Sequence, residues 1–189
     1  MNTLALETKR LTLRRMQVAD CERMVQYLGD FEVSSKLARV PHPYPPEHAR
    51  EILSKQDKIA AQGILAFTID DGTGLVGGIN ARPFEDGHYV GYWLGKPYWG
   101  KGYMSEALAA VLHHLFVTLS TPKVRSTVFL ENAASAGLLS KFGYELLGQS
   151  EDPCAARGGR IFPVRVFELS RERYLYIMQN AEGQEEVRL

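Results

Sequence analysis

Apolar positions in the first half of the chain predict four strands and two helices. Leu11, Leu13 and Met16 alternate with other residues, which indicates a strand over 10–16, and helical spacing follows over 18–28. A proline-rich loop comes next, and a second helix is expected over 46–61, where Pro46 occupies a favoured first-turn position. Three apolar strands joined by tight turns then follow, over residues 64–69, 75–81 and 88–94.

Strands and helices alternate in the second half. The apolar residues from Met104 to Leu119 recur at helical spacing, so one face of this helix is expected to pack on the sheet. A shorter helix is expected over 132–142, ending at Gly143, because glycine is favoured just beyond a helix C-terminus. Further strands are predicted over residues 123–130, 144–149 and 161–169.

Together these elements predict one α/β (α+β) domain over residues 1–178, in which helices flank a mixed, mostly antiparallel central sheet. The acidic stretch over 179–189 is expected to be a flexible tail.

Composition limits the classes of function. The 189 residues include 22 Lys and Arg against 22 Asp and Glu, so the net charge of zero argues against a broad nucleic-acid or membrane surface. No segment approaches the ~20 apolar residues of a membrane helix, and no signal peptide is expected. Cys21 and Cys154 lack metal-ligand spacing, so we expect a reduced, cytoplasmic setting and no metal.

The strongest chemical signal is the sequence GYWLGKPYWGKGYMSEA, which runs from Gly91 to Ala107. It combines an aromatic strand, a glycine-rich turn and the start of a helix. Glycines let successive backbone N–H groups turn toward one point, and the first amides of a helix have partial positive charge. The pattern therefore predicts an anion cradle whose guest is a phosphate or pyrophosphate.

Two other interpretations of this turn stay open on these residues alone. The turn is close to a nucleotide-binding phosphate loop, but Gly102 stands where a Ser or Thr hydroxyl should meet magnesium. A purely structural strand-to-helix turn would need the same glycines.

A second sequence block helps to choose among these interpretations of the glycine turn. FLENAASAGLLSKFGYELLG runs from Phe129 to Gly148. Together with the glycine block and the opening segment ETKRLTLR (7–14), it resembles the GCN5-related N-acetyltransferase (GNAT) superfamily, and most closely the branch that acetylates ribosomal-protein N-termini. The resemblance runs from residue 6 to residue 169. It implies a sheet splayed between its fourth and fifth strands, and Gly91 suits a β-bulge that would open this slot.

The resemblance also implies acetyl-CoA as co-substrate. Its pyrophosphate is expected to bind N–H groups of the glycine turn. Its pantetheine arm is expected to bind the backbone of the preceding strand and the side chain of Asn132. Pro97 departs from the family's Arg or Gln, which puts one side-chain phosphate contact in question. The implied cofactor-binding residues are Tyr92, Trp93, Leu94, Trp99, Gly100, Lys101, Gly102, Tyr103 and Asn132.

Catalysis is implied at Ser135, because Asn132 and Ser135 occupy the family's N-x-x-S positions. Ser135 would donate a proton to the departing thiolate, and Tyr144 is a weaker donor candidate. Helix capping is the alternative explanation for both N-x-x-S residues. The N–H of Trp93 or Leu94 is expected to stabilise the oxyanion.

The acceptor is less well defined. His88 and Tyr89 are expected to line the substrate site, but Tyr89 stands where related sequences often have a Glu base, so no base is assigned. An α-amine with pKa ~8 is partly neutral near pH 7.4, whereas a lysine at ~10.4 is not. We therefore expect direct acetyl transfer to a primary amine, foremost a protein N-terminus. A small amine (antibiotic, polyamine or amino acid) and a non-catalytic acyl-CoA-binding module are the alternatives, and a homodimer stays open.

Overall fold

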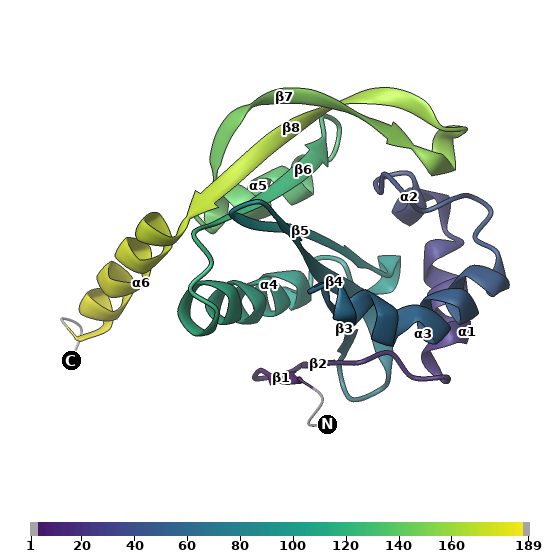
Figure 1. The fold of residues 1–189 in the computed structure, drawn as a ribbon, viewed down its shortest axis with the longest axis horizontal. Coiled ribbons are helices and arrows are strands. Elements are labelled where there is room, and N and C mark those ends of the chain that lie inside the picture. The colour runs from purple at the N-terminus through teal and green to yellow at the C-terminus, as the bar shows by residue number, and fades with distance from the viewer. Residues whose placement is uncertain (1–3, 187–189) are drawn as a thin grey trace.

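One eight-stranded sheet runs through the molecule in the order β1-β2-β3-β4-β5-β6-β8-β7 (Figure 1). The computed structural model describes residues 4–186, with side chains described up to residue 180. All neighbouring strands are antiparallel except β5 and β6, which confirms the mixed, mostly antiparallel α/β fold. The strands are β1 (Leu6–Glu7), β2 (Thr12–Arg14), β3 (Leu65–Asp70), β4 (Leu75–Phe84), β5 (Gly87–Leu94), β6 (Lys123–Phe129), β7 (Glu145–Cys154) and β8 (Arg160–Ser170).

The sheet opens between β5 and β6. These strands pair only from Gly87↔Lys123 to Tyr89↔Arg125, and beyond that point they diverge. The splay predicted between the fourth and fifth strands is therefore confirmed, with the short β1 shifting the numbering by one. The bulge expected at Gly91 is wrong, because β4 and β5 pair without a register shift through Asn80↔Gly91. At the fork, the Ser126 hydroxyl donates to the Val90 carbonyl at 2.9 Å, so a side chain takes the place of the next strand-to-strand bond.

Helices cover both faces of the sheet (Figure 1). The segment between β2 and β3 forms α1 (Asp20–Leu28), α2 (Phe31–Ser34) and α3 (Pro46–Ala61). After β5 come η1 (Lys96–Tyr98), α4 (Tyr103–His113) and a π-helical turn, η2 (His114–Thr118). The C-terminal part contains α5 (Ala133–Lys141), η3 (Ala155–Arg157) and α6 (Arg171–Glu186).

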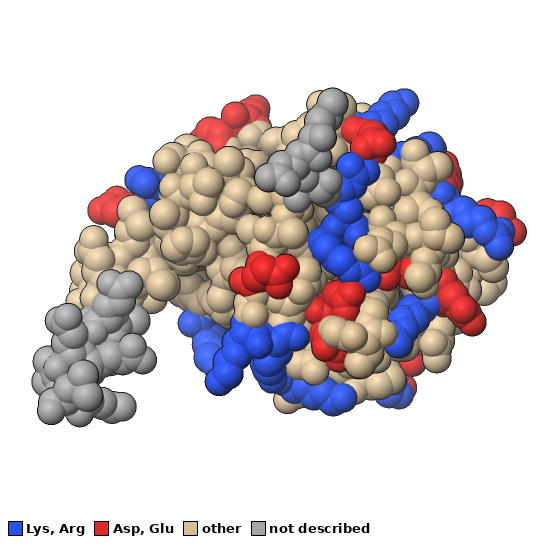
Figure 2. Space-filling view, turned by 90° about the horizontal axis from the view of Figure 1, so that it is seen from below, with Lys and Arg blue, Asp and Glu red and all other residues tan. Residues whose placement is uncertain are grey.

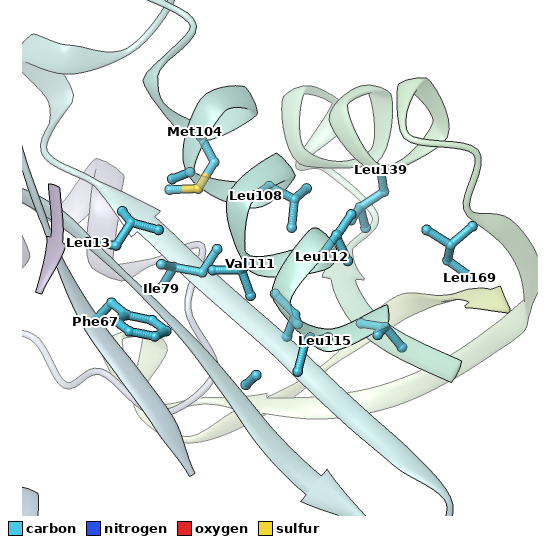
Figure 3. Packing of buried hydrophobic residues seen from close by; sticks show 14 of the residues in the cluster. Leu13, Phe67, Ile79, Met104, Leu108, Val111, Leu112, Leu115, Leu139 and Leu169 are labelled. Atoms are coloured by element: carbon cyan, nitrogen blue, oxygen red, sulfur yellow. The ribbon is translucent and has the colours of Figure 1, made fainter. Parts of the chain in front are cut away.

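The main core lies between α4 and one face of the sheet (Figure 3). Met104, Leu108 and Leu115 of this helical segment are buried, at the spacing that the sequence predicts. They pack in one cluster with sheet residues such as Leu13 and Ile79. Each fully buried side chain of this size contributes roughly 1.5–3 kcal/mol. This packing holds the N-terminus of α4 beside the end of β5.

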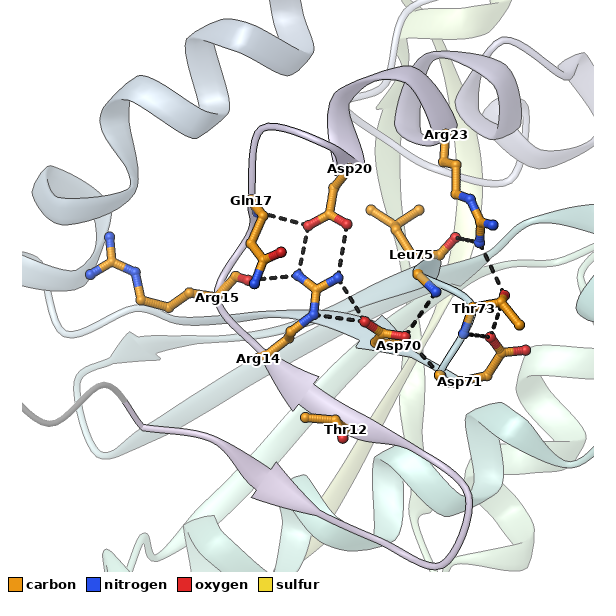
Figure 4. Close-up of polar contacts among 12 residues, drawn as sticks. Thr12, Arg14, Arg15, Gln17, Asp20, Arg23, Asp70, Asp71, Thr73 and Leu75 are labelled. Atoms are coloured by element: carbon orange, nitrogen blue, oxygen red, sulfur yellow. Dashed lines mark hydrogen bonds and ion pairs between the residues drawn. The ribbon is translucent and has the colours of Figure 1, made fainter.

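A largely buried ion network ties β2 to α1 and to the β3–β4 turn (Figure 4). Both terminal nitrogens of Arg14 donate to the Asp20 carboxylate at 2.8 and 2.9 Å, and Arg14 Nε donates to Asp70 at 2.8 Å. Hydrogen bonding to Asp20 raises the pKa of Arg14 despite burial. Burial alone would raise the pKa of Asp70, but hydrogen bonds from Arg14 and from the Gly72 and Gly74 amides lower it overall.

The sequence pattern misses α6. Tyr174 anchors this helix, stacking on Phe116 with ring centroids 4.8 Å apart. Because α6 extends to Glu186, the domain boundary after residue 178 falls inside a helix. That residues 179–189 form a flexible tail stays a prediction, and the last three residues of this stretch, 187–189, lie outside the residues that the structure describes.

Positive and negative side chains are interspersed on the face shown in Figure 2, which agrees with the zero net charge. Within residues 4–186, no helix has the length and apolar character needed to cross a bilayer. Over the same residues, His, Cys, Asp and Glu form no group of three or more that could hold a metal ion.

Candidate active site

A cavity of about 1380 Å³ occupies the splay and continues toward α3 and the β7–β8 hairpin. It brings together residues from the glycine turn, from β5 and from the start of α5. Of the residues predicted to form the site, its lining includes Tyr89, Tyr92, Trp93, Leu94, Trp99, Gly100, Gly102, Tyr103, Asn132 and Ser135. Lys101 and His88 are not among the lining residues.

The glycine turn has the conformation of an anion cradle. Gly100 and Gly102 have φ angles of 72° and 78°, and Gly102 is the residue that precedes α4. Within residues 4–186, the N–H groups of Gly100 through Tyr103 have no backbone or side-chain acceptor. The Trp99 N–H differs from these four, because it donates to the Lys96 carbonyl at 3.2 Å at the end of η1, and its predicted contact with a pyrophosphate stays a prediction.

The backbone of β5 presents alternate residues to the splay. Gly95 N–H donates to the Val76 carbonyl at 2.9 Å, and bonded residues alternate along an antiparallel pair. Trp93 therefore directs its N–H toward β4, whereas Tyr92 and Leu94 direct theirs toward the opening. Of the two amides expected to stabilise an oxyanion, only that of Leu94 faces the splay.

The side chains of β5 alternate in the same way. Tyr89 and Trp93 face the cavity on the α3 side, where Trp93 covers Gly78 so closely that a Cβ there would lie 2.7 Å from Trp93 Nε1. His88 points away, with Nδ1 at 3.1 Å from Thr121 Oγ1, and burial lowers its pKa. The cavity lining therefore includes Tyr89 but not His88, and a role of Tyr89 in substrate binding stays a prediction.

Tyr92 and Ser135 meet across the splay. Their hydroxyl oxygens are 2.9 Å apart, and burial raises the pKa of Tyr92 to about 12. Asn132 Oδ1 accepts the Ser135 N–H at 3.3 Å, so the expected helix cap is present beside this contact. The sequence pointed only to the backbone of Tyr92, although strand alternation already places its side chain opposite to those of Tyr89 and Trp93.

Tyr144 lies deeper than Ser135. It does not line the cavity, its hydroxyl has no hydrogen-bond partner among the described residues, and burial raises its pKa. Since the cavity does not reach it, Tyr144 is a weaker proton donor candidate than Ser135.

The β7–β8 hairpin bounds one side of the cavity, with Ser150, Asp152, Val164 and Val166 in its lining. At its tip, Ala155 N–H donates to the Ala38 carbonyl at 2.9 Å, and Cys154 Sγ lies 3.5 Å from the Ser35 carbonyl oxygen. These contacts join the hairpin to the loop after α2, as Figure 1 shows at the right. The charged residues that line the cavity are Lys36, Arg39, Arg82, Glu51 and Asp152.

Comparisons with known proteins agree with this geometry. The family model "Acetyltransferase (GNAT) domain" matches residues 10–145. The uncharacterized N-acetyltransferase p20 of Bacillus licheniformis is 30% identical over 176 residues, which cover 89% of this chain and 97% of that protein. The [ribosomal protein uS5]-alanine N-acetyltransferase of Escherichia coli is 33% identical over 64 residues, covering 34% of this chain and 33% of that protein.

Solved structures show the same fold. A GNAT-family acetyltransferase from Bacillus anthracis superposes with a TM-score of 0.76 at 22% identity, over 89% of this chain and 99% of that one. The ribosomal L7/L12 α-N-protein acetyltransferase RimL, solved in complex with coenzyme A, gives a TM-score of 0.75 at 17% identity, over 90% and 99%. With the domain match and the p20 relative, these findings show that the chain belongs to the GNAT family of acetyl-CoA-dependent N-acetyltransferases.

Proposed function

We propose that this enzyme transfers acetyl directly from acetyl-CoA to the α-amine of a protein N-terminus. The observation that supports this most is the single cavity that joins the free amides of the glycine turn, the open side of β5 and Ser135. A bound acetyl-CoA supplies the acetyl group as a reactive thioester. Every other requirement falls on residues of this chain.

Binding falls to backbone groups. The N–H groups of Gly100 through Tyr103 donate to the pyrophosphate, at a helix start that favours negative charge. The outward-facing backbone of Tyr92 and the Asn132 side chain hold the pantetheine amides. The Leu94 N–H donates to the thioester oxygen as that atom gains negative charge, a contact that strengthens in the transition state.

Ser135 acts as the proton donor to the departing sulfur. Its hydroxyl contacts Tyr92 Oη at 2.9 Å; a tyrosine is already protonated at neutral pH, and burial raises the pKa of Tyr92 further, to about 12. Tyr92 can therefore donate a hydrogen bond to Ser135 Oγ and hold the hydroxyl in a fixed direction. We expect this acid catalysis to contribute up to about 10²-fold to the rate, the low end of its usual range.

The acceptor follows from proton chemistry and from charge. An α-amine with pKa ~8 needs little help to lose its proton, which suits a site in which no base is assigned. The cavity lining includes three cationic residues (Lys36, Arg39 and Arg82) and only two acids, which disfavours a polyamine. The partial similarity to the [ribosomal protein uS5]-alanine N-acetyltransferase supports a protein amine as the acceptor.

The test is an acetylation assay with three acceptors. The first is a peptide with a free N-terminus and no lysine, the second is a peptide with a blocked N-terminus and one internal lysine, and the third is a polyamine. We expect turnover with the first alone. The substitution Ser135→Ala should lower turnover ~10- to 100-fold without changing acetyl-CoA affinity. Ser140→Ala is the matched control, because Ser140 lies exposed on the same helix. Acetyl-CoA binding without turnover on any amine would instead favour a binding module.

A further inference from the structure

Arg10, in the loop between β1 and β2, reaches across the fold to the glycine turn. Its Nη1 donates to the Lys101 carbonyl at 2.9 Å, although 91 positions separate these residues in the sequence. Its guanidinium also lies 4.9 Å from the centroid of the Tyr103 ring. The side chain therefore rests on the outer side of the turn that forms the cradle.

Glu106, in the first turn of α4, holds this arginine in place. Its Oε2 accepts from Arg10 Nε at 2.7 Å, and its Oε1 accepts from the Arg10 backbone N–H at 2.6 Å. The Thr8 hydroxyl donates to the same Oε1 at 2.7 Å. Burial would raise the pKa of Glu106, but these hydrogen bonds from Thr8 and Arg10 lower it overall, so the carboxylate is ionised at neutral pH.

The peptide group that Arg10 contacts is one whose plane flips at little energetic cost. It joins Lys101 to Gly102, and glycine adopts positive and negative φ with similar ease. In a planar trans peptide the carbonyl and the N–H point in opposite directions. Fixing the Lys101 carbonyl on the outer side therefore fixes the Gly102 N–H on the cavity side, where Gly102 is part of the lining.

We infer that Arg10 is a positioning residue for the cofactor: with Glu106 it holds the Lys101–Gly102 peptide so that the Gly102 N–H points at the pyrophosphate. This inference rests on the proposed function, since it assumes that the cradle binds acetyl-CoA. Arg10 acts through the backbone, which distinguishes it from a side chain whose charge alone attracts phosphate.

The experiment compares two acetyl donors, acetyl-CoA and S-acetylpantetheine, which has the same thioester but no pyrophosphate. Arg10→Gln should raise the KM for acetyl-CoA about tenfold, the effect of a lost hydrogen bond to a charged group. Its kcat, and its kcat/KM with S-acetylpantetheine, should stay within about twofold of the wild type. Arg10→Lys should keep most of the defect, because an ammonium lacks the planar fork that spans Glu106 and Lys101.

Arg173→Gln is the matched control. The Arg173 side chain is 45% exposed, as is that of Arg10. It likewise donates to a backbone carbonyl, that of Gly143 at 2.6 Å, and pairs with a glutamate, Glu145. This variant should leave the kinetic constants with both acetyl donors unchanged. If Arg10→Gln lowers the melting temperature too far for kinetics, Glu106→Gln should show the same selective rise in KM, at a smaller size.

Three outcomes would overturn the inference. Full recovery of KM in Arg10→Lys would mean that charge alone matters, and an equal loss with both donors would mean a general structural defect. An unchanged KM in Arg10→Gln would exclude any role at the cradle. A wild-type enzyme that fails to bind acetyl-CoA would be a separate result, because it refutes the proposed function itself.

Discussion

Arg10 and Arg14 stand four positions apart in the same opening segment, and each binds a carboxylate, yet they serve different parts of the molecule. The Arg14 side chain is 17% exposed and its partner Asp20 only 3%, and their network joins three elements of the scaffold (Figure 4). The Arg10 side chain is 45% exposed and ends on a backbone carbonyl of the glycine turn. Burial and the element that bears the partner thus separate an arginine that stabilises the fold from one that shapes the site.

The largest expected effect comes from Arg14→Met. Removing this guanidinium leaves the buried Asp20 carboxylate without its ionic partner, although the Gln17 N–H still donates to it at 2.7 Å. This loss costs about 3 kcal/mol in the free energy of unfolding. In a domain of this size that loss lowers the melting temperature by roughly 6–12 °C. The KM for acetyl-CoA should not change, because Arg14 has no contact with the glycine turn. Thermal unfolding followed by circular dichroism, together with donor kinetics, measures both quantities.

Arg15→Met is the control for this substitution. Arg15 pairs with Asp57, whose side chain is 87% exposed, and such surface pairs are worth about 1 kcal/mol or less. Equal destabilisation by the two variants would contradict the distinction between a buried and an exposed ion network. A rise in donor KM caused by Arg14→Met would contradict the separation of scaffold from site.

The elements of the fold follow from the sequence because their causes are local. Met104, Leu108 and Leu115 repeat at helical spacing, and Pro46 begins α3 where the sequence predicts it. The opening of the sheet is not local, since Ser126 must reach Val90 of another strand. The bulge predicted at Gly91 was wrong, because β4 and β5 pair through Asn80↔Gly91 without a register shift.

The candidate site divides in the same way. The glycines indicate the cradle because their conformational role is local, whereas Ser135 was implied by the family resemblance, through its N-x-x-S positions. The Tyr92–Ser135 contact and the reach of Arg10 join residues 43 and 91 positions apart, and no spacing rule connects them. The Trp99 N–H is used inside the chain for a local reason, the short η1 turn, and the contact of Trp99 with a pyrophosphate stays a prediction.

A second prediction tests the Arg14 network by pH. The pKa of Asp70 is lowered in the folded protein. The ionised Asp70 carboxylate therefore stabilises the fold fully above the ordinary aspartate pKa of about 3.9, and this stabilisation is lost as the pH falls through the pKa of the folded state. Asp70→Asn should cost about 1.5 kcal/mol at neutral pH. The difference in free energy of unfolding between wild type and variant should become smaller below about pH 4, and urea unfolding at several pH values measures it. A difference that stays constant down to about pH 2 would show that the Asp70 charge is not what stabilises the turn.

The smallest expected effect comes from Thr8→Val, which probes the cradle side of the comparison. This change removes the hydroxyl that donates to Glu106 at 2.7 Å and that also bonds the Leu11 carbonyl and N–H at 2.9 and 3.0 Å. It leaves the Arg10–Glu106 contacts in place. Because Glu106 then orients Arg10 less tightly, we expect the KM for acetyl-CoA to rise only about twofold, with a stability loss near 1 kcal/mol. Thr12→Val is the matched control, since Thr12 donates to the exposed Glu7 and not to Glu106. A graded series, in which Arg10→Gln exceeds Glu106→Gln and Thr8→Val follows, would mean that the carboxylate acts through the arginine. A larger effect from Thr8→Val than from Arg10→Gln would instead make Glu106 the group that orders the turn, with Arg10 as one of its partners.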